Sequence, residues 1–326
     1  MSTLEFRVAI RDAIAEEMER DPSVFFLGED VAVPGGVFKA TPGLHERFGG
    51  ERVMDTPISE LALAGAAFGA AVTGLRPIIE IMFGDFMALP MDALVNQAAK
   101  YWYISNEQAN VPLVVRSAVG GGGRFGAVHS QTHGTWFQGI PGLKIAMPST
   151  SAEAKGLLKG AIRDPNPVIF MEHKRLYSVK DEVPDRIDAL ELGRARIARE
   201  GGDLTIVSIG KTVRDAVAAA GQLAGDGIDA EVVDLRTLRP LDLETVLESV
   251  EKTNRLVAIE EGPRTGGWAT GVLGAVAEAA LHDLDDAWIV ATDETPIPYS
   301  PTLEDAFVPN ADMIVADVRN RLGAAV

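Results

Sequence analysis

The sequence predicts an α/β protein made of two parallel-sheet domains, each with helices on both faces of its sheet in three layers. Short runs rich in β-branched residues alternate with longer helical patterns along the chain, which is typical of parallel sheets. The length of 326 residues suits two domains better than one. A polar stretch that contains a proline, Ser178–Arg199, separates two sets of elements. We therefore expect a domain over residues 1–180, a linker over 181–199 and a second domain over 200–326.

The expected elements follow from the spacing of apolar residues. In the first set we expect strands at Val24–Leu27, 77–82, Leu113–Ser117 and Pro167–Met171, and helices near 3–20, 59–73, 86–99 and 151–163. In the second set we expect strands at Leu204–Ile209, Ile228–Leu235, Leu256–Ile259 and Trp288–Ala291, and helices near 211–224, 242–252, 265–281 and 310–322. Strands and helices alternate in both sets, so both sheets are expected to be parallel.

Charge is distributed unevenly along the chain. The formal net charge of −17 repels phosphate backbones, so nucleic acid is not an expected partner. Residues 1–180 carry 17 basic and 19 acidic side chains, whereas residues 181–326 carry 13 and 28. The nearly neutral first part presents less charge to water, which indicates a surface that another chain buries.

Other features of the composition exclude several classes of site. The chain has no cysteine, which excludes disulfides, zinc–thiolate sites and thiol nucleophiles. Its first residues form an acidic amphipathic pattern, unlike the basic and apolar pattern of a signal peptide. The longest apolar stretch, Leu61–Gly74, is shorter than the roughly 20 residues that span a bilayer. We therefore expect a cytoplasmic protein with no membrane partner.

Two glycine motifs resemble phosphate-binding sites. Gly121-x-Gly123-x-x-Gly126 follows an expected strand, but no acidic residue occurs between it and Ala152, where a dinucleotide site would need one. A flexible glycine loop near a ligand is the better interpretation.

The second motif, Gly225-Asp226-Gly227 with Asn254 downstream, has the spacing of the magnesium–diphosphate motif of thiamine enzymes. Its context argues against that function, because the glycines leave a helix and enter a strand, the reverse of the order that the motif needs. We interpret it as an ordinary helix-to-strand turn.

Glu60 lies where a helix is expected to begin. Ser59 is a natural N-cap, and the helix dipole favours a carboxylate in the first turn, so composition alone favours a structural role for Glu60. The helix is rich in small residues that allow another backbone to approach closely: Ala62, Gly65, Ala66, Gly69 and Ala70.

His129 and His133 stand in a glycine-rich stretch that is expected to be a loop. A metal site is not expected there, because no acidic residue is near in the sequence. A loop histidine suits proton transfer near neutral pH, and the alternative is a histidine that only forms hydrogen bonds within the loop.

Eight short stretches together resemble the beta chain of the thiamine-diphosphate-dependent decarboxylase component of 2-oxo acid dehydrogenase complexes, of the pyruvate, branched-chain or acetoin type. The resemblance covers essentially the whole chain and is specific for the family but not for the substrate. The stretches are Gly28–Val31, Asp55–Glu60, Gly74–Pro77, His129–Gln131, Pro141–Lys144, Ala154–Gly156, Ala161–Pro167 and Thr237–Pro240.

The resemblance implies a transketolase-like pyrimidine-binding domain followed by a transketolase C-terminal domain. It also implies thiamine diphosphate as cofactor, with magnesium and the diphosphate held by an alpha subunit in a heterotetramer of two alpha and two beta chains. A lipoyl acyltransferase core is the further implied partner. The absence of a convincing diphosphate motif from this chain agrees with binding of the diphosphate by the alpha subunit.

Particular residues match functional positions of the family. Glu60 matches the glutamate that drives the aminopyrimidine of thiamine to its imino tautomer. The resemblance therefore favours a catalytic role for Glu60 over the structural role that composition alone favours. Phe86 matches an aromatic residue against the pyrimidine ring. Glu29 and Asp92 match acidic positions toward the channel between the two cofactors. His129 matches a histidine implicated in passing the acyl group to the lipoyl arm.

Five further residues match a potassium site that relatives build mainly from backbone carbonyls, and hard oxygen ligands suit an alkali cation. A capped helix end is the alternative interpretation. The residues are Leu113, Ala161, Ile162, Asp164 and Asn166.

The expected function is therefore that of a beta subunit that supports oxidative decarboxylation of a 2-oxo acid with acyl transfer to lipoamide. The alternative enzyme is a non-oxidative, split transketolase-like transferase subunit. A scaffold without activity is disfavoured because Glu60 and His129 are both present. The departures from the family pattern are the glycines Gly120–Gly123 and Val128, which leave the shape of the substrate entrance open.

Overall fold

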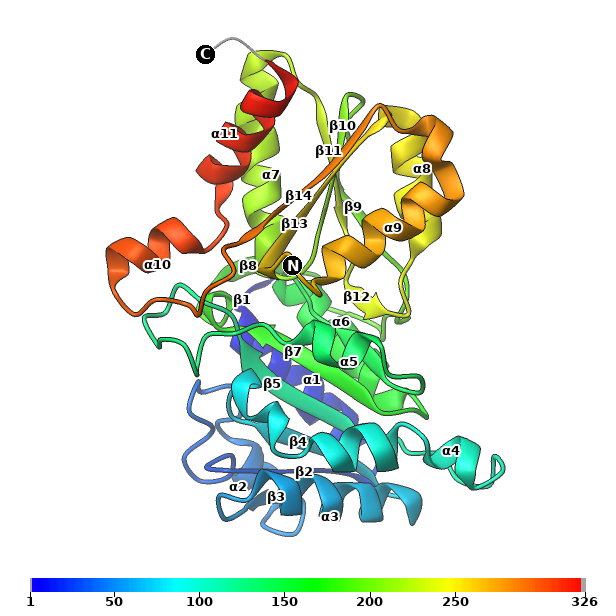
Figure 1. The fold of residues 1–326 in the computed structure, drawn as a ribbon. Coiled ribbons are helices and arrows are strands. Elements are labelled where there is room, and N and C mark those ends of the chain that lie inside the picture. Colours follow the sequence, from blue (N-terminus) through cyan, green and yellow to red (C-terminus); the bar gives the residue numbers. More distant parts are fainter. Residues whose placement is uncertain (1, 324–326) are drawn as a thin grey trace.

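The computed structural model describes residues 2–323 and contains two large sheets, stacked one above the other in Figure 1. The N-terminal sheet has seven strands in the order β12 (Thr237–Arg239), β6 (Lys144–Ala146), β7 (Val168–His173), β5 (Val114–Val119), β4 (Arg76–Ile81), β2 (Val24–Gly28) and β3 (Val53–Asp55). The C-terminal sheet has five, in the order β14 (Asp286–Thr292), β13 (Arg255–Pro263), β10 (Leu204–Ser208), β11 (Ala230–Asp234) and β9 (Arg196–Arg199). Both sheets are parallel except at one edge, where β12 and β9 run antiparallel to their neighbours.

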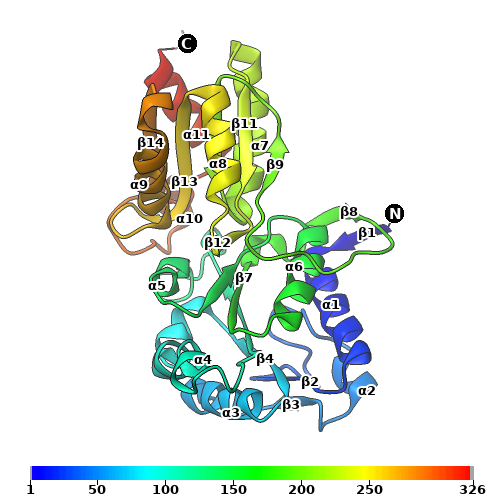
Figure 2. The same ribbon diagram turned by 90° about the vertical axis from the view of Figure 1, so that its right-hand side faces the viewer.

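Helices cover both faces of the N-terminal sheet, so it forms three layers as expected (Figure 2). One face packs against α1 (Phe6–Arg20) and α6 (Ser151–Arg163), and the other against α3 (Glu60–Val72) and the π-helix η2 (Ala93–Ala98). Side chains alternate between the faces along each strand. In β4, for example, Ile78 joins the α1–α6 core and its neighbour Ile79 the α3–η2 core.

The C-terminal sheet also lies between two helical layers. α7 (Lys211–Leu223) and α11 (Ala311–Leu322) lie on one face, and α8 (Leu243–Thr253) and α9 (Trp268–Ala280) on the other. The apolar core beneath α3 continues without interruption into the layer of α8 and α9, so the two sheets share one core. The short helices are α2 (Leu44–Phe48), α4 (Tyr101–Ile104), α5 (Gly134–Gln138), α10 (Pro301–Phe307) and the 3-10 turns η1 (Gly84–Ala88), η3 (Lys174–Leu176), η4 (Ala224–Asp226) and η5 (Leu281–Asp283).

The chain crosses between the two sheets more than once. β12 belongs to the C-terminal part of the sequence but extends the edge of the N-terminal sheet beside β6. β1 (Ser2–Glu5) pairs with β8 (Lys180–Val183), which enters the segment expected to be a linker, and β9 lies at the end of that segment. The division of the chain at residues 181–199 stays a prediction.

The expected elements are present within a few residues of their expected bounds, with two differences. The first helix begins at Phe6 because residues before it form β1. The helix expected over 86–99 is replaced by η1 and η2, and Pro90 lies between them, where a missing N–H and a ring clash interrupt a helix. In residues 2–323 we find no helix long and apolar enough to cross a membrane.

Candidate active site

The topology of the N-terminal sheet brings the main predicted residues to one edge. Glu29 directly follows β2, Glu60 follows β3, Phe86 follows β4 and His129 follows β5. These strands are parallel, so their carboxyl ends meet at the same edge, where ligands of open α/β sheets bind. Residues spread over a hundred positions of sequence therefore meet at one place.

Glu60 is the first residue of α3 and is buried. Ser59 precedes it as expected, but its side chain makes no capping hydrogen bond. Within residues 2–323 no side chain or N–H forms a hydrogen bond or ion pair with the Glu60 carboxylate. The Glu60 oxygens are not fully enclosed, unlike Oε1 of Glu29, so a donor from outside the chain can reach them.

Glu29 is a second buried carboxylate beside Glu60. Burial, followed by the negative charges of Glu60 and Asp30, raises the pKa of Glu29, and the Ser59 N–H opposes the shift. Its Oε1 has no hydrogen-bond partner in the described part of the chain. The two glutamates thus provide acceptor atoms that this chain alone leaves unused.

Aromatic rings hold His129 next to Phe86. The imidazole centroid lies 5.3 Å from that of Phe86 and 4.7 Å from that of Phe83, with the rings nearly perpendicular to it at 78° and 84°. Such edge-to-face packing is favourable and restricts the orientation of the ring. The structure therefore brings Phe86 and His129 together, and His129 remains half-buried.

Lys174, which the sequence analysis did not single out, lies at the same edge directly after β7. Its Nζ donates to the backbone carbonyl of His129 at 2.7 Å and lies above the rings of Phe83 and Phe125 at 5.5 and 5.7 Å. Burial lowers the pKa of Lys174 to about 8, although nearby carboxylates oppose the shift. The position at the carboxyl end of a strand was the only signal in the sequence that could have indicated it.

The segment after His129 is anchored by Asp85 of η1, which neighbours Phe86. Gln131 Nε2 donates to Asp85 Oδ1 at 2.8 Å, and His133 Nε2 lies 3.7 Å from the same oxygen. Burial would raise the pKa of Asp85, but His133 and Gln131 outweigh it and lower the pKa. The His133 ring also stacks on Trp136 at 3.7 Å. His133 is thus a buried structural residue of the loop.

A cavity of about 460 Å³ lies between this segment and the C-terminal domain. Its lining includes Gln131, His133, Glu261 and Glu294 but neither Glu60 nor Phe86. This cavity is therefore not the place where the predicted catalytic residues gather.

Two known domain families match this chain. The transketolase pyrimidine-binding domain matches residues 2–180, and the transketolase C-terminal domain matches residues 193–314. The pyruvate dehydrogenase E1 component subunit beta of Rhizobium meliloti is 47% identical over 98% of this chain and 70% of its own length. The 2-oxoisovalerate dehydrogenase subunit beta of Bacillus subtilis is 46% identical over 98% of both chains. The chain belongs to the 2-oxo acid dehydrogenase beta-subunit family.

Two further proteins bear on the choice between a dehydrogenase subunit and a transketolase subunit. The acetoin:2,6-dichlorophenolindophenol oxidoreductase subunit beta of Cupriavidus necator is 47% identical over 98% of this chain and 97% of its own length. A solved split-gene transketolase, described as an inactive beta4 tetramer, has a TM-score of 0.81 with 24% identity, and the match covers 98% of this chain and 99% of that one. The transketolase likeness shows the fold alone, so the relatives support the beta-subunit assignment over the split-transketolase alternative.

Asp92 of this beta subunit lies on the surface just before η2. Hydrogen bonds from Asn96 at 2.8 Å and Gln97 at 3.0 Å lower the pKa of Asp92. Its carboxylate is therefore occupied by side chains of its own helix, unlike those of Glu29 and Glu60.

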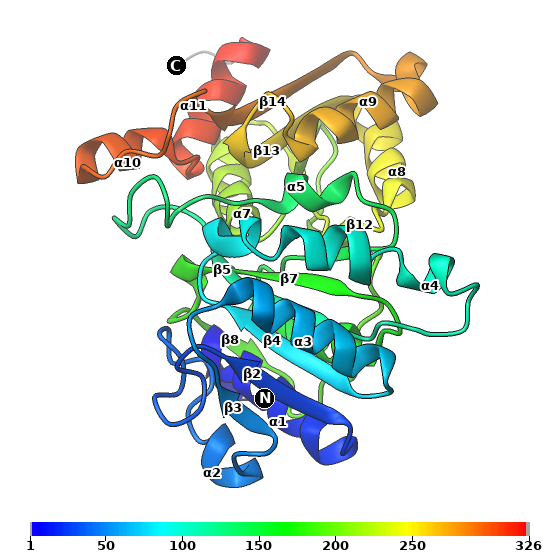
Figure 3. The ribbon, with the colours of Figure 1, turned by 60° about the horizontal axis from the view of Figure 1, so that its bottom comes forward.

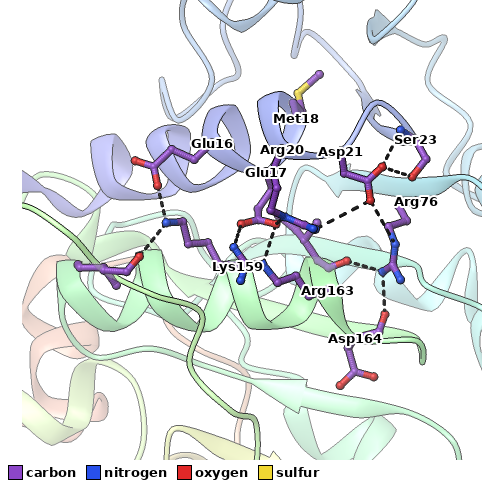
Figure 4. A network of polar contacts seen from close by, with 12 residues as sticks. Glu16, Glu17, Met18, Arg20, Asp21, Ser23, Arg76, Lys159, Arg163 and Asp164 are labelled. Atoms are coloured by element: carbon purple, nitrogen blue, oxygen red, sulfur yellow. Dashed lines mark hydrogen bonds and ion pairs between the residues drawn. The ribbon is translucent and has the colours of Figure 1, made fainter.

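The residues predicted to bind potassium meet where α6 ends beside β5 and β7. Arg76 Nη1 donates to the carbonyls of Ile162 at 2.7 Å and Asp164 at 3.2 Å (Figure 4). The Asp164 carboxylate contacts Lys144 at 2.5 Å and accepts from the backbone N–H and the side chain of Asn166 at 2.9 Å.

Two further carbonyls of the predicted potassium site, those of Ala161 and Leu113, are also used. The Ala161 carbonyl accepts from Asp164 N at 3.2 Å, and the Leu113 carbonyl accepts from Val168 N at 2.8 Å. The first bond is that of a helix end and the second joins the starts of β5 and β7, and each carbonyl retains a second lone pair.

Proposed function

We propose that the chain, with an alpha subunit, supports thiamine-diphosphate-dependent oxidative decarboxylation of a 2-oxo acid and transfer of the acyl group to a lipoyl acyltransferase. The observation that carries the proposal is the unpartnered carboxylate of Glu60, a largely buried residue at the sheet edge that also holds Phe86 and His129. The identity of 47% to a pyruvate dehydrogenase beta subunit supports the same conclusion.

The residues at the edge suit the pyrimidine end of thiamine diphosphate. When bound, this cofactor supplies the thiazolium carbon that attacks the 2-oxo acid. Glu60 would hold and return a proton at the pyrimidine ring nitrogen, because its carboxylate has no other partner in the described chain. Phe86 offers an apolar surface to orient the ring, and Oε1 of Glu29 offers an unused acceptor.

An alpha subunit is proposed to hold magnesium and the diphosphate, in a heterotetramer of two alpha and two beta chains. The Gly225–Gly227 motif does not serve that purpose, because it forms the turn between α7 and β11, and Asp226 pairs with Arg319 at 2.8 Å. Potassium at Leu113, Ala161, Ile162, Asp164 and Asn166 stays a prediction, as does the location of the enzyme in the cytoplasm.

His129 is proposed to act on the acyl acceptor. Its ring is half-buried beside Phe86, in a loop whose neighbours Phe125 and Val128 are exposed, so a lipoyl group could approach it from solvent. An imidazole in that position would supply a proton or hydrogen bond to the lipoyl sulfur.

The substrate is proposed as a class because relatives of three substrate types are equally similar, at 47%, 47% and 46% identity. Steady-state assays of the reconstituted alpha–beta pair against pyruvate, 2-oxoisovalerate and acetoin would identify it. We expect thiamine-dependent turnover of at least one of them, with acyl transfer to a lipoyl domain. Ketol transfer between sugar phosphates, with no turnover of these three compounds, would contradict the proposal.

A further inference from the structure

The loop that leads to His129 takes its shape from the C-terminal domain. The segment Gly120–His129 begins with four glycines, and Gly120, Gly122, Arg124 and Gly126 have positive φ angles. A chain of this composition has much conformational freedom and does not hold one shape by itself. In Figure 1 and Figure 3 the loop extends from the N-terminal sheet to the side of α10.

A buried glutamate from α10 binds the middle of this loop. Glu304 Oε1 accepts the N–H of Gly122 at 2.8 Å, and Oε2 accepts the N–H of Arg124 at 3.1 Å. The Arg124 guanidinium donates to Glu304 Oε2 at 2.6 Å and reaches the exposed Asp305 at 2.6 and 2.7 Å. The Glu304 side chain is fully buried, although 182 positions separate it from Gly122.

A second buried glutamate, Glu261 of β13, binds the start of the loop. Its Oε1 accepts the N–H of Gly121 at 2.6 Å, and its Oε2 lies 2.9 Å from His173 Nε2. His173 Nδ1 accepts the Arg175 N–H at 3.1 Å, so Nε2 carries the proton and donates it to Glu261. Burial would raise the pKa of Glu261, but His173, the Gly121 N–H and Lys211 lower it. The carboxylate is therefore charged and fully used.

Position 120 must be glycine for this arrangement. A Cβ there would lie 2.1 Å from His173 Nε2, and the residue has a φ of +94°. At the other end of the loop, the His129 N–H donates to the Gly126 carbonyl at 3.3 Å. The His129 carbonyl accepts from Lys174 Nζ. Strand β7 and the C-terminal domain thus fix both ends and the middle of the loop.

We propose that Glu304 and Glu261 are positioning residues for His129. They contact neither the imidazole nor the Phe86 ring, and they act by holding the backbone of Gly121, Gly122 and Arg124. The C-terminal domain thereby sets where the imidazole stands. The inference rests on the proposed function for the role of His129, but the contacts with the loop do not depend on that role.

Glu304→Gln in the assembled alpha–beta enzyme tests the proposal, with Asp305→Asn as the matched control on the same helix. The glutamine keeps the size of the side chain but loses the charge and one acceptor oxygen. We expect amide hydrogen exchange over Gly120–Phe125 to rise at least tenfold and reductive acylation of the lipoyl domain to fall at least tenfold. Decarboxylation with an artificial electron acceptor should change less than threefold. Asp305→Asn, which affects only an exposed contact with Arg124, should leave all three within twofold.

Unchanged exchange over the loop would overturn the proposal, whatever the enzyme does with 2-oxo acids. Faster exchange with equal loss of both half-reactions would also overturn it, because the glutamate would then support the whole site rather than His129. If the Glu304 variant cannot be isolated folded, Glu261→Gln provides the same two measurements at the start of the loop. Faster exchange in an enzyme that never acylates lipoamide would support the contacts while contradicting the proposed function.

Discussion

Each half of the chain has a buried glutamate at a helix N-terminus: Glu60 is the first residue of α3, and the side chain of Glu260, from strand β13, reaches the first residues of α9. Both oxygens of Glu260 accept backbone N–H groups of the helix, from Trp268 at 2.9 Å and Ala269 at 3.0 Å. The Glu60 carboxylate forms no such bond with residues 2–323. The same residue type at a helix N-terminus therefore stabilises one helix and remains open for a ligand at the other.

The two halves also differ in how much apolar surface they expose. Twelve of the sixteen large hydrophobic side chains exposed in the described residues belong to positions 1–180, which are also nearly neutral in charge. Ile58 and Leu61, beside Glu60, are among them, at 84% and 55% exposure. The half with open acceptors is therefore also the half whose apolar surface a partner would cover.

Substitution of Glu60 by Gln should have the largest effect. An amide cannot pass a proton to the pyrimidine, so activity should fall at least about a hundredfold in the reconstituted enzyme. The melting temperature should stay within a few degrees, because no hydrogen bond of α3 is lost. Glu260→Gln is the matched control, and it should lower stability while retaining activity. Near wild-type decarboxylation by the Glu60 variant would return this residue to a structural role.

Glu260 should make the stability of the folded chain depend on pH. Burial raises the pKa of Glu260 from 4.5 to about 7 against the two N–H donors, so between these values the folded chain retains a proton that the unfolded chain has lost. The stabilisation is complete below pH 4.5 and disappears as the pH rises to about 7, a loss of up to about 3 kcal/mol.

Thermal unfolding of wild type and Glu260→Gln from pH 4 to pH 8 measures this effect. The glutamine does not titrate, so the difference in melting temperature between the two proteins should be largest at low pH and should narrow toward pH 7. A difference that stays constant over this range would mean that Glu260 is ionised in the folded chain.

Leu61→Gln should weaken binding of the alpha subunit. Burying a leucine contributes about 1.5 to 3 kcal/mol, so the affinity measured by calorimetry should fall at least about tenfold. Val217→Gln on α7 is the control in the other half, since Val217 is 36% exposed and lies on the charged half of the chain. Equal effects of the two substitutions, or none, would contradict the comparison of the two surfaces.

His129→Ala should separate the two half-reactions. Reductive acylation of the lipoyl domain should fall about tenfold or more, because the imidazole is proposed to act on the lipoyl sulfur. Decarboxylation followed with an artificial electron acceptor should suffer less. Equal loss in both assays would assign His129 to substrate binding or decarboxylation.

The smallest expected effect concerns potassium. If the ion shares the carbonyls of Ile162 and Asp164 with Arg76, it should stabilise the folded enzyme by mass action. Exchange of potassium for a tetraalkylammonium salt at constant ionic strength should then lower the melting temperature by a few degrees. An unchanged melting temperature would favour a capped helix end over a potassium site. The Arg76 guanidinium would then be the cation that binds these carbonyls.

The sequence predicted the long elements well and the short ones poorly. Strands such as β4 and helices such as α6 show enough apolar periodicity to be identified alone. β12 and β9 have three and four residues, and their pairing depends on partners far along the chain. The broken helix over 86–99 is a different case, because the signal of Pro90 was present in the sequence.

The candidate site was predictable to the extent that it follows strand ends and family motifs. Glu60 and His129 could be assigned by resemblance, and the structure explains why they lie at one edge. The supports of His129 could not be assigned, because Glu261 and Glu304 come from a different domain, 140 and 182 positions from the glycines that they bind. No local pattern of sequence encodes such a contact.

The pairing of β12 with β6 has a consequence for any attempt to work with half of the protein. A gene cut between the two sheets would leave the edge of β6 without its neighbour, and an unpaired edge strand promotes aggregation. The same cut would expose the core that continues from α3 to α8 and α9. Recombinant halves should therefore be insoluble when produced separately and recoverable when produced together, a property that would suit this chain to a split-reporter design.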